Sequence, residues 1–262
     1  MTEQRFRVGS VPYVNAYPLI GLEPVAGLEV ELAVPSRLPA LLETGAVDAI
    51  LVSSFYALTQ PGVCIVGDVA IGSRGPVDSV RLFSKVPFGE IRHLALDSSS
   101  MTSNALAMIL LQNVYGCSPE AAQHPPDLTK MLGVADAAIL IGDIGMTEPG
   151  DGLEVLDLGA AWTDWTGLPF VWAVWTGREG VSAELGRLLN QSWVDWRRTL
   201  ASPYANDWWS KAQARCGWPM ERLQQYLTST MRYELDADAK AGLRRFAEEL
   251  ASSSASRTYQ TL

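Results

Sequence analysis

The chain has 262 residues, of which 48% are hydrophobic and 19% charged. This length suits one large α/β unit or two lobes of about 100–150 residues each. The formal net charge of −9 at pH 7 argues against a nucleic acid or an anionic membrane surface as a partner, because both are themselves negative. An anionic small molecule is still compatible with this charge, since a local site can be positive inside an acidic protein.

The cysteines and histidines indicate the cellular compartment and limit the kinds of catalytic site that we expect. The three cysteines (Cys64, Cys117 and Cys216) are odd in number and far apart, which is typical of a reducing compartment. The first ten residues show no signal-peptide pattern, and no apolar run reaches the length of a membrane span. We therefore expect a cytoplasmic protein. The two histidines, His93 and His124, lie at a strand edge and before two prolines, so we expect neither a Ser-His-Asp triad nor a metal site.

Apolar and β-branched runs predict strands along the first 180 residues. The predicted strands are residues 6–11, 29–35, 48–52, 64–71, 77–83, 93–97, 137–141, 153–156 and 170–176. A first helix is expected to run from its cap at Ser36 through Thr44, with Gly45 behind it. Further helices are predicted over residues 101–115, near 128–132, and from 182 to about 252. The remaining tail is expected to be frayed or loosely docked.

The order of these elements indicates two lobes. Residues 84–89 read as a crossover out of a first lobe, and the strand at 170–176 reads as the return. We therefore assign residues 1–85 and 176–262 to lobe one, which the late helices complete, and residues 86–175 to lobe two. This is the layout of a periplasmic-binding-protein-like fold of type II, an α/β fold in which the ligand cleft lies between two lobes that can close.

A faint internal echo accompanies this layout. Residues 45–53, GAVDAILVS, resemble residues 133–143, GVADAAILIGD, which begin 88 residues later. In both segments a glycine ends a helix, a short polar step follows, and a buried strand finishes in small or polar residues. The echo is either a coincidence of common residues or the mark of two similarly wound lobes.

Hydroxyl side chains gather at the junction 94–104, LALDSSSMTSN, just before a long apolar helix. The start of a helix exposes unbonded N–H groups and the positive end of its dipole, so it can bind an anion. One serine would suffice as an N-cap, whereas Ser98, Ser99, Ser100, Thr102 and Ser103 all lie here. The surplus indicates either a binding site for a carboxylate or phosphate, or simply a serine-rich turn with one capping residue.

Polar residues also follow the first and third strands. The first strand leads into Ser10, Tyr13 and Asn15, and Asn15 either faces the cleft or caps the short helix after it. Ser53 and Ser54 end the third strand, with the same two alternatives.

Two further candidates belong to the middle of the chain. Ser79 begins the strand predicted after a glycine-rich loop and is expected to point inward. Arg74 and Arg81, on either side of it, are expected to face solvent. Asp143 follows the strand at 137–141 and either caps the next turn or orients a ligand hydroxyl.

Together these segments resemble the chorismate dehydratase family of the futalosine route to menaquinone. The resemblance rests on PYVNAYPL, SRGPVDSVRLFSK, LALDSSSMTSNALAMILL, AAILIGD and WTDWTGLPFVWAVW, in matching order between residue 6 and about residue 176. A sibling family, the dihydroxynaphthoate synthases, shares the fold, but these segments are more similar to the dehydratases. Beyond residue 180 only a compatible helical pattern is seen.

The resemblance implies a hydro-lyase that converts chorismate to 3-[(1-carboxyvinyl)oxy]benzoate and water, with no cofactor. It also implies that Asn15 and Ser79 are active-site polar groups, which we expect to hydrogen-bond the leaving hydroxyl or the ring carboxylate. The base is either Asp143 or, as we favour, the enolpyruvyl carboxylate of chorismate itself. A solute-binding module without chemistry is the alternative from another class of protein, because the fold alone does not imply catalysis.

Overall fold

The computed structural model describes residues 5–252, so the predicted C-terminal tail lies outside the described residues. The chain divides into two compact units and crosses between them after Gly72, Trp172 and Asp236. All three crossings differ from the sequence-based boundaries, the return before Ala173 by only three residues. Residues 73–85 and the last helix belong to the second unit, where we had expected them in the first.

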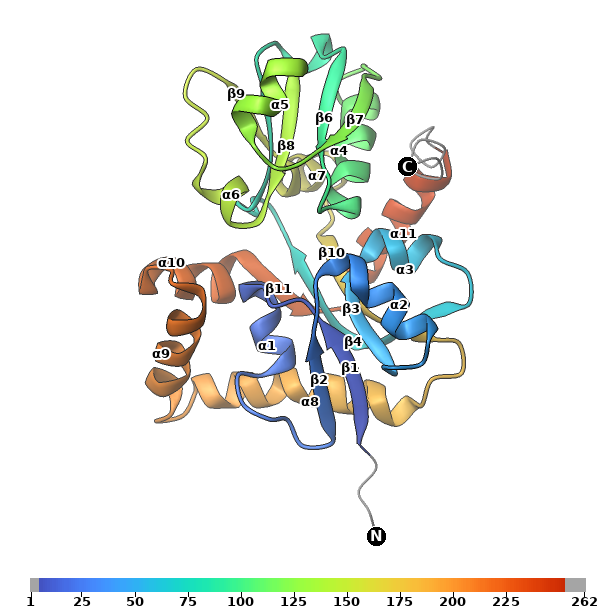
Figure 1. The fold of residues 1–262 in the computed structure, drawn as a ribbon, viewed down its shortest axis with the longest axis vertical. Helices are drawn as coiled ribbons and strands as arrows, with labels where there is room; N and C mark the ends of the chain where they lie inside the picture. Colours follow the sequence, from blue (N-terminus) through green and yellow to red (C-terminus); the bar gives the residue numbers. More distant parts are fainter. Residues whose placement is uncertain (1–4, 253–262) are drawn as a thin grey trace. The chain divides into compact units, whose positions relative to one another are not determined.

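The first unit is built on a six-stranded sheet with the order β11-β4-β10-β3-β1-β2 (Figure 1). Strand β1 pairs in parallel with β2 and with β3, and β10 runs antiparallel to β3. The strand bounds are β1 (Phe6–Ser10), β2 (Leu28–Leu32), β3 (Ala49–Ser53), β4 (Val63–Ser73), β10 (Phe170–Arg178) and β11 (Met231–Glu234). Strand β3, AILVS, is buried along almost its whole length, as expected of a strand covered on both faces.

Helices cover this sheet and account for most of the late sequence. They are a 3-10 turn (Val14–Ala16), α1 (Tyr17–Ile20), a second 3-10 turn (Pro35–Arg37), α2 (Leu38–Glu43), α3 (Ser54–Thr59), α8 (Ala183–Leu200), α9 (Ala205–Cys216), α10 (Met220–Gln225) and a π-helix (Tyr226–Thr230). Ser36 lies inside the second 3-10 turn, so it does not cap α2; Arg37 precedes that helix, without a side-chain cap bond. Gly45 follows α2 with φ +73°, in the role predicted for it.

The second unit has a five-stranded sheet with the order β7-β6-β8-β5-β9 (Figure 1). Strand β6 is parallel to β7 and β8, whereas β5 is antiparallel to β8 and β9. The strand bounds are β5 (Val80–Ser84), β6 (His93–Asp97), β7 (Glu120–His124), β8 (Ala137–Ile141) and β9 (Glu154–Asp157). Strand β7 escaped sequence analysis because its residues, EAAQH, are mostly exposed and carry no apolar alternation.

The helices of this unit are α4 (Met101–Asn113), α5 (Leu128–Val134), α6 (Gly142–Thr147), α7 (Leu158–Thr166) and α11 (Ala237–Ser252), with a 3-10 turn at Phe88–Glu90. Helix α4 is apolar almost all round and is buried between neighbours, in contact with β8, α7 and α11. Helix α11 joins this unit because Phe246 packs edge-on against Trp162 of α7, at 6.3 Å between ring centroids, and against Phe170 at 5.0 Å. Phe170 lies in the first three residues of β10, which belong to this unit.

The internal echo corresponds to equivalent places in the two sheets. Residues 45–53 enter β3 and residues 133–143 enter β8. Each of these strands lies between a parallel neighbour (β1 or β6) and an antiparallel one (β10 or β5). The chain therefore winds in the same way in both units, β1-β2-β3 in one and β6-β7-β8 in the other. Among residues 5–252, no helix is both long and apolar enough to cross a bilayer.

Candidate active site

The buried carboxylate of Asp97 organises the hydroxyl-rich junction. Asp97 ends β6 and is completely inaccessible to solvent. Its Oδ1 accepts hydrogen bonds from the backbone N–H of Ser99, at 2.8 Å, and from the Ser99 hydroxyl. Its Oδ2 accepts from the N–H of Ile141 at 3.3 Å, at the end of the neighbouring strand β8. Asp97 therefore ties the turn before α4 to the carboxyl end of β8.

The five hydroxyls of this junction divide into distinct roles. Ser100 caps α4 by accepting from the N–H of Ser103 at 3.3 Å, while Ser99 is bound to Asp97. Ser98 and Ser99 are exposed, whereas Thr102 and Ser103 are buried in the first turn of the helix. That first turn contains no acidic residue, so the positive end of the helix dipole is not neutralised within it.

Strand pairing brings Ser79 to the same edge of the sheet. Val80 pairs with Ile141, so Ser79 lies just before β5 beside the carboxyl end of β8. Ser79 is buried, with 5% of its surface exposed. Gly145 of α6 packs directly on it, since a Cβ at Gly145 would lie 2.9 Å from the Ser79 carbonyl oxygen. The expectation that Ser79 points into the protein agrees with this burial.

Helix α6 presents Asp143 and is fixed by Arg81. The Arg81 guanidinium donates to the carbonyl oxygens of Gly145 and Glu148, both at 2.6 Å. The expectation that Arg81 faces solvent is therefore wrong, because its guanidinium is needed where the helix backbone leaves carbonyls unpaired. Asp143, in the first turn, is exposed, and its backbone carbonyl accepts from Thr147 at 2.7 Å. Arg74 is exposed as expected, but it is paired with Asp238 at 3.2 Å.

In the first unit, the candidates lie after the carboxyl end of β1. Ser10 is fully buried, and its hydroxyl donates to the carbonyl of Val11 at 3.3 Å. Tyr13 is 44% exposed. Asn15 lies within the 3-10 turn, where Tyr13 and Ala16 are the residues preceding the two short helices. Asn15 is thus not a helix cap, and its Oδ1 is buried without a hydrogen-bond partner among residues 5–252.

The carboxyl end of β3 contributes two serines to the same sheet edge. Ser53 caps α3 by accepting from the N–H of Tyr56 at 3.2 Å, so the capping alternative accounts for its side chain. Ser54 is fully buried in the first turn of α3. Since β1 and β3 are parallel neighbours, these residues share one edge of the first sheet: Ser10 and Ser53 end the two strands, and Asn15 and Ser54 follow them.

Each unit therefore gathers hydroxyl and amide groups at the carboxyl edge of its parallel strands, where α/β sheets commonly bind ligands. The structure adds a residue that sequence reasoning missed. Asn104 is buried in α4, and its Nδ2 donates to the carbonyl of Asp97 at 2.8 Å. Its Oδ1 has no partner among the described residues. A polar amide on the otherwise apolar helix was the available signal.

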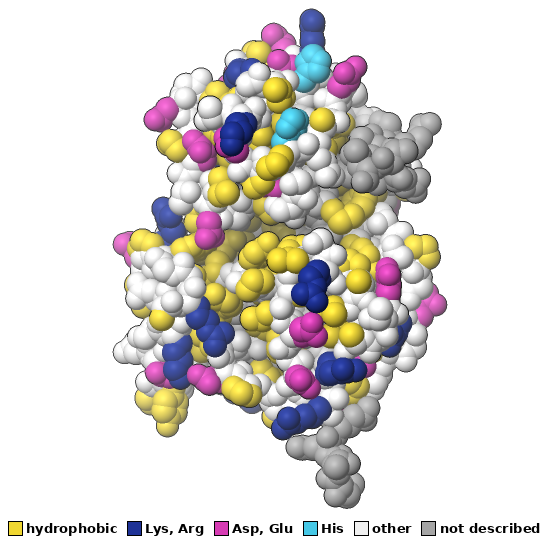
Figure 2. Space-filling view, in the orientation of Figure 1, with side chains coloured by type: hydrophobic (Ala, Val, Ile, Leu, Met, Phe, Trp, Pro, Cys, Tyr) yellow, Lys and Arg dark blue, Asp and Glu magenta, His cyan; other side chains and the backbone are white. Residues whose placement is uncertain are grey.

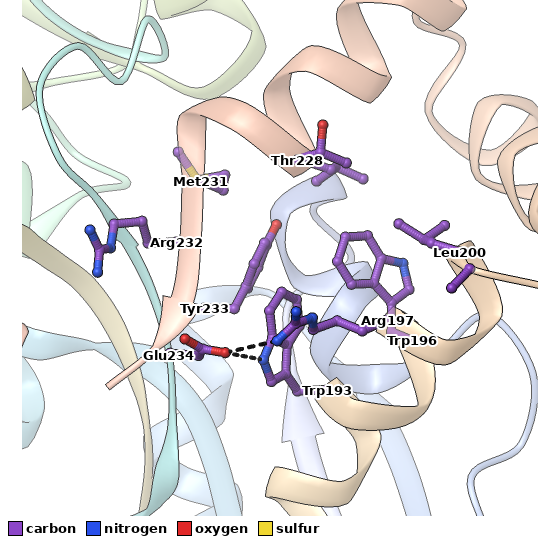
Figure 3. A pocket seen from close by; sticks show the side chains of 11 residues that line it. Trp193, Trp196, Arg197, Leu200, Thr228, Met231, Arg232, Tyr233 and Glu234 are labelled. Atoms are coloured by element: carbon purple, nitrogen blue, oxygen red, sulfur yellow. Dashed lines mark hydrogen bonds and ion pairs between the residues drawn. The ribbon is translucent and has the colours of Figure 1, made fainter. Parts of the chain in front are cut away.

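A pocket of about 540 Å³ lies elsewhere in the first unit, between the end of α8, the π-helix and β11 (Figure 3). Glu234 accepts there from Arg197 at 3.2 Å and from the indole of Trp193 at 3.4 Å. None of the predicted site residues lines it. The Tyr233 hydroxyl and the Trp196 indole nitrogen in its wall have no partner in the described chain, but both atoms are enclosed and inaccessible.

The two histidines lie at opposite ends of the parallel strands of the second sheet: His93 begins β6, whereas His124 ends β7, in register with Asp97 at the carboxyl edge. Over residues 5–252, no three His, Cys, Asp or Glu side chains gather as metal ligands would. Both histidines reach the surface, where Figure 2 shows them in cyan. His93 pairs with Asp136 at 3.5 Å, and backbone donors from His93 and Arg92 hold the pKa of the Asp136 carboxyl below its usual value.

Comparison with solved structures defines the class of protein. A protein of Archaeoglobus fulgidus superposes with a TM-score of 0.70 at 16% identity, covering 96% of this chain and 98% of that one. The periplasmic aliphatic sulphonate binding protein of Escherichia coli superposes with a TM-score of 0.64 at 14% identity, covering 95% and 87% of the two chains. The chain thus has the α/β fold of the periplasmic binding proteins.

Sequence comparison identifies the family within that class. A family model described as menaquinone biosynthesis matches residues 6–252. The chain is also 31% identical to the chorismate dehydratase of Thermus thermophilus, over 93% of this chain and 94% of that protein. The protein belongs to the menaquinone biosynthesis family.

Proposed function

We propose that the protein is a chorismate dehydratase, which converts chorismate to 3-[(1-carboxyvinyl)oxy]benzoate and water. The observation that carries this proposal is the 31% identity to a chorismate dehydratase over nearly the whole of both chains. The reaction removes the C4 hydroxyl and the C3 hydrogen and leaves an aromatic ring, so its equilibrium is already favourable. The enzyme must hold a flexible dianion in one geometry and assist departure of the hydroxyl.

The second-unit edge is suited to one carboxylate of chorismate. The first turn of α4 contains no acidic residue to neutralise the positive end of the helix dipole. The exposed hydroxyl of Ser98 lies beside this turn, while the hydroxyl of Ser99 already donates to Asp97. A carboxylate bound there would meet a turn whose backbone Asp97 and Ser100 already hold in place, so little ordering is needed on binding. Thr102 and Ser103, in the same turn, complete the polar wall. Met101, 46% exposed, offers apolar surface to the ring.

Asn15 and Ser79 are assigned to the leaving hydroxyl or the ring carboxylate. The unpaired Oδ1 of Asn15 is a costly feature unless a ligand or water supplies a donor. A substrate hydroxyl is such a donor, while the Asn15 Nδ2 can donate to an oxygen that gains negative charge as the C–O bond breaks. Ser10, Tyr13, Ser53 and Ser54 shape the surroundings of Asn15 at the same sheet edge.

The proton at C3 goes to the enolpyruvyl carboxylate of the substrate in this proposal. Asp143 is the alternative base at a strand end, but its side chain is exposed and makes no hydrogen bond that orients it among residues 5–252. A carboxylate held against the ring inside the complex is better placed to take the proton. Replacing Asp143 by Asn should therefore leave turnover within a few-fold of wild type. Loss of turnover with unchanged chorismate affinity would instead assign the base to Asp143.

Incubation of the purified protein with chorismate tests the function directly. Appearance of the aromatic enol ether by NMR, matched by loss of chorismate, is the expected result. Binding of chorismate by calorimetry without any product would show a binding module on the same fold. Turnover of a cyclised futalosine derivative in place of chorismate would point to the sibling synthase activity.

The cellular setting follows from the same proposal. A biosynthetic enzyme acting on chorismate works in the cytoplasm, and the three thiols of Cys64, Cys117 and Cys216 are unpaired with one another, as a reducing compartment requires. Burial raises the pKa of the Cys64 and Cys117 thiols, which makes them less reactive.

A further inference from the structure

The loop that delivers Ser79 is held by one carboxylate from a distant part of the chain. Asp157, at the end of β9, accepts from the backbone N–H of Val77 at 3.0 Å and from that of Asp78 at 2.7 Å. The same carboxylate caps α7 by accepting from the N–H of Ala160 at 2.9 Å. The same carboxylate of Asp157 thus caps the helix and holds the loop. Asp157 lies 79 residues after Asp78 in the sequence.

The first turns of α7 are shaped to receive this loop. The N–H of Gly75 donates to the Thr163 hydroxyl at 2.8 Å. Gly159 lies between the two anchors, and a Cβ there would come within 2.7 Å of the Gly75 carbonyl oxygen. The loop backbone therefore rests directly on the helix, at a distance that only glycine at position 159 permits.

Asp78, the residue before Ser79, has an unfavourable backbone conformation. Asp78 has φ +62° and is the only non-glycine residue with positive φ in the described chain. Such a conformation costs free energy and persists when neighbouring contacts impose it. The bond from the Asp78 N–H to Asp157 is one such contact, and the turn closes with the N–H of Ser79 donating to the carbonyl of Val77 at 2.7 Å.

We propose that Asp157 is a positioning residue for catalysis, which fixes the strained Val77–Asp78 backbone so that Ser79 is presented at the carboxyl edge of the second sheet. This inference rests on the proposed function of Ser79. Asp157 does not itself touch substrate, and acts only through the loop.

The electrostatic environment of the Asp157 carboxylate favours a positioning role over a role in stability. Burial raises the pKa of this carboxyl despite its three backbone donors, and the neighbouring Asp78 carboxylate raises it further. A buried carboxylate whose ionised form is disfavoured has a reason to be present when its hydrogen bonds hold an active-site loop in place.

Hydrogen exchange of the backbone amides tests the clamp without any activity. In Asp157→Asn, one acceptor oxygen becomes an amide donor, so the N–H groups of Val77 and Asp78 should exchange about tenfold faster or more. Asp127→Asn is the matched control, because Asp127 caps α5 by accepting from Lys130 at 3.1 Å and holds no loop. Unchanged exchange at residues 77–78 in Asp157→Asn would overturn the clamp.

Kinetics with chorismate then test the link to Ser79. Asp157→Asn should impair the same parameter, kcat or KM, that Ser79→Ala impairs, by about 10- to 100-fold. The double variant should be little worse than Ser79→Ala alone, because Asp157 acts through that residue; additive losses would show a merely structural role. Gly159→Ala, which displaces the loop but keeps the carboxylate, should reproduce the defect.

The two proposals fail in different ways. If Ser79→Ala retains full activity, the role of Ser79 is wrong, and the exchange data alone decide whether the clamp exists. If Ser79→Ala is impaired while Asp157→Asn and Gly159→Ala match wild type, the positioning role is wrong and the proposed function stands.

Discussion

At the residue scale, the contribution of Asp157 to the free energy of unfolding should depend on pH. Because burial raises its pKa in the folded protein above the ordinary value, its contribution to stability is fully present below the unfolded pKa of about 4 and is lost as the pH rises through the folded pKa. The free energy of unfolding of wild type relative to Asp157→Asn should therefore fall between pH 4 and pH 7. Urea unfolding at several pH values measures this, and a difference that rises over the range would contradict the burial effect.

Also at the residue scale, replacing Asn15 should lower turnover without lowering stability. Its buried Oδ1 has no partner in the described chain, so Asn15→Leu should leave the free energy of unfolding unchanged or about 1 kcal/mol higher. Turnover of chorismate should nevertheless fall by about 100- to 1,000-fold, as when a transition-state donor is removed.

A matched control for Asn15 lies in α8. The Oδ1 of Asn190 accepts from the N–H of Asp68 at 2.7 Å, so Asn190→Leu removes a satisfied amide of the same size. It should lower the free energy of unfolding by about 1 kcal/mol and leave turnover unchanged. Full activity of Asn15→Leu would remove Asn15 from the proposed site.

At the element scale, the turn from β6 into α4 depends on Asp97 more than on its many hydroxyls. Asp97→Ala would leave the half-buried N–H of Ile141 and the Ser99 donors without their acceptor. The free energy of unfolding should fall by about 2 kcal/mol or more, measured by denaturant titration. Ser98→Ala, at an exposed position, should change it by less than about 0.5 kcal/mol. Equal effects would show that the carboxylate does not organise the turn.

Elements with a strong local pattern agreed with prediction, and weakly patterned ones did not. Strands β3, β6 and β8 are apolar runs and lie where predicted. Strand β11 was read as helix because the sequence around it carries helical spacing. It pairs with β4 at the edge of the first sheet, and its Tyr233 ring packs on Trp193 of α8 at 4.8 Å between ring centroids. That partner lies 40 residues earlier in the chain, and no local pattern shows it.

At the scale of the whole molecule, the assignment of α11 to the second unit is testable. Gly242 of α11 packs on the segment before β10 so closely that an added Cβ would overlap the carbonyl oxygen of Pro169. Gly242→Ala should therefore lower the free energy of unfolding by about 2 kcal/mol or more, because backbone must move. Gly133→Ala in α5, where nothing lies within 4 Å of the added atom, should raise it by about 0.5–1 kcal/mol.

Thermal unfolding of the two glycine variants distinguishes these outcomes. A destabilised Gly242→Ala with a stabilised Gly133→Ala supports the docking of α11. If Gly242→Ala melts like wild type, α11 does not rest on the Pro169 segment as described.

The sequence by itself determined the α/β class, the two-unit organisation, the family resemblance and the strand ends that carry polar groups, because these are recorded in local runs, caps and short motifs. Only the tertiary structure decided which unit receives β5 and α11, which serines act as caps, and that Asp157 holds the loop of Ser79. These depend on contacts between segments far apart in the chain, such as Phe246 on Phe170 and Asp157 on Asp78. Such contacts follow from shape and burial in three dimensions, and local periodicity does not encode them.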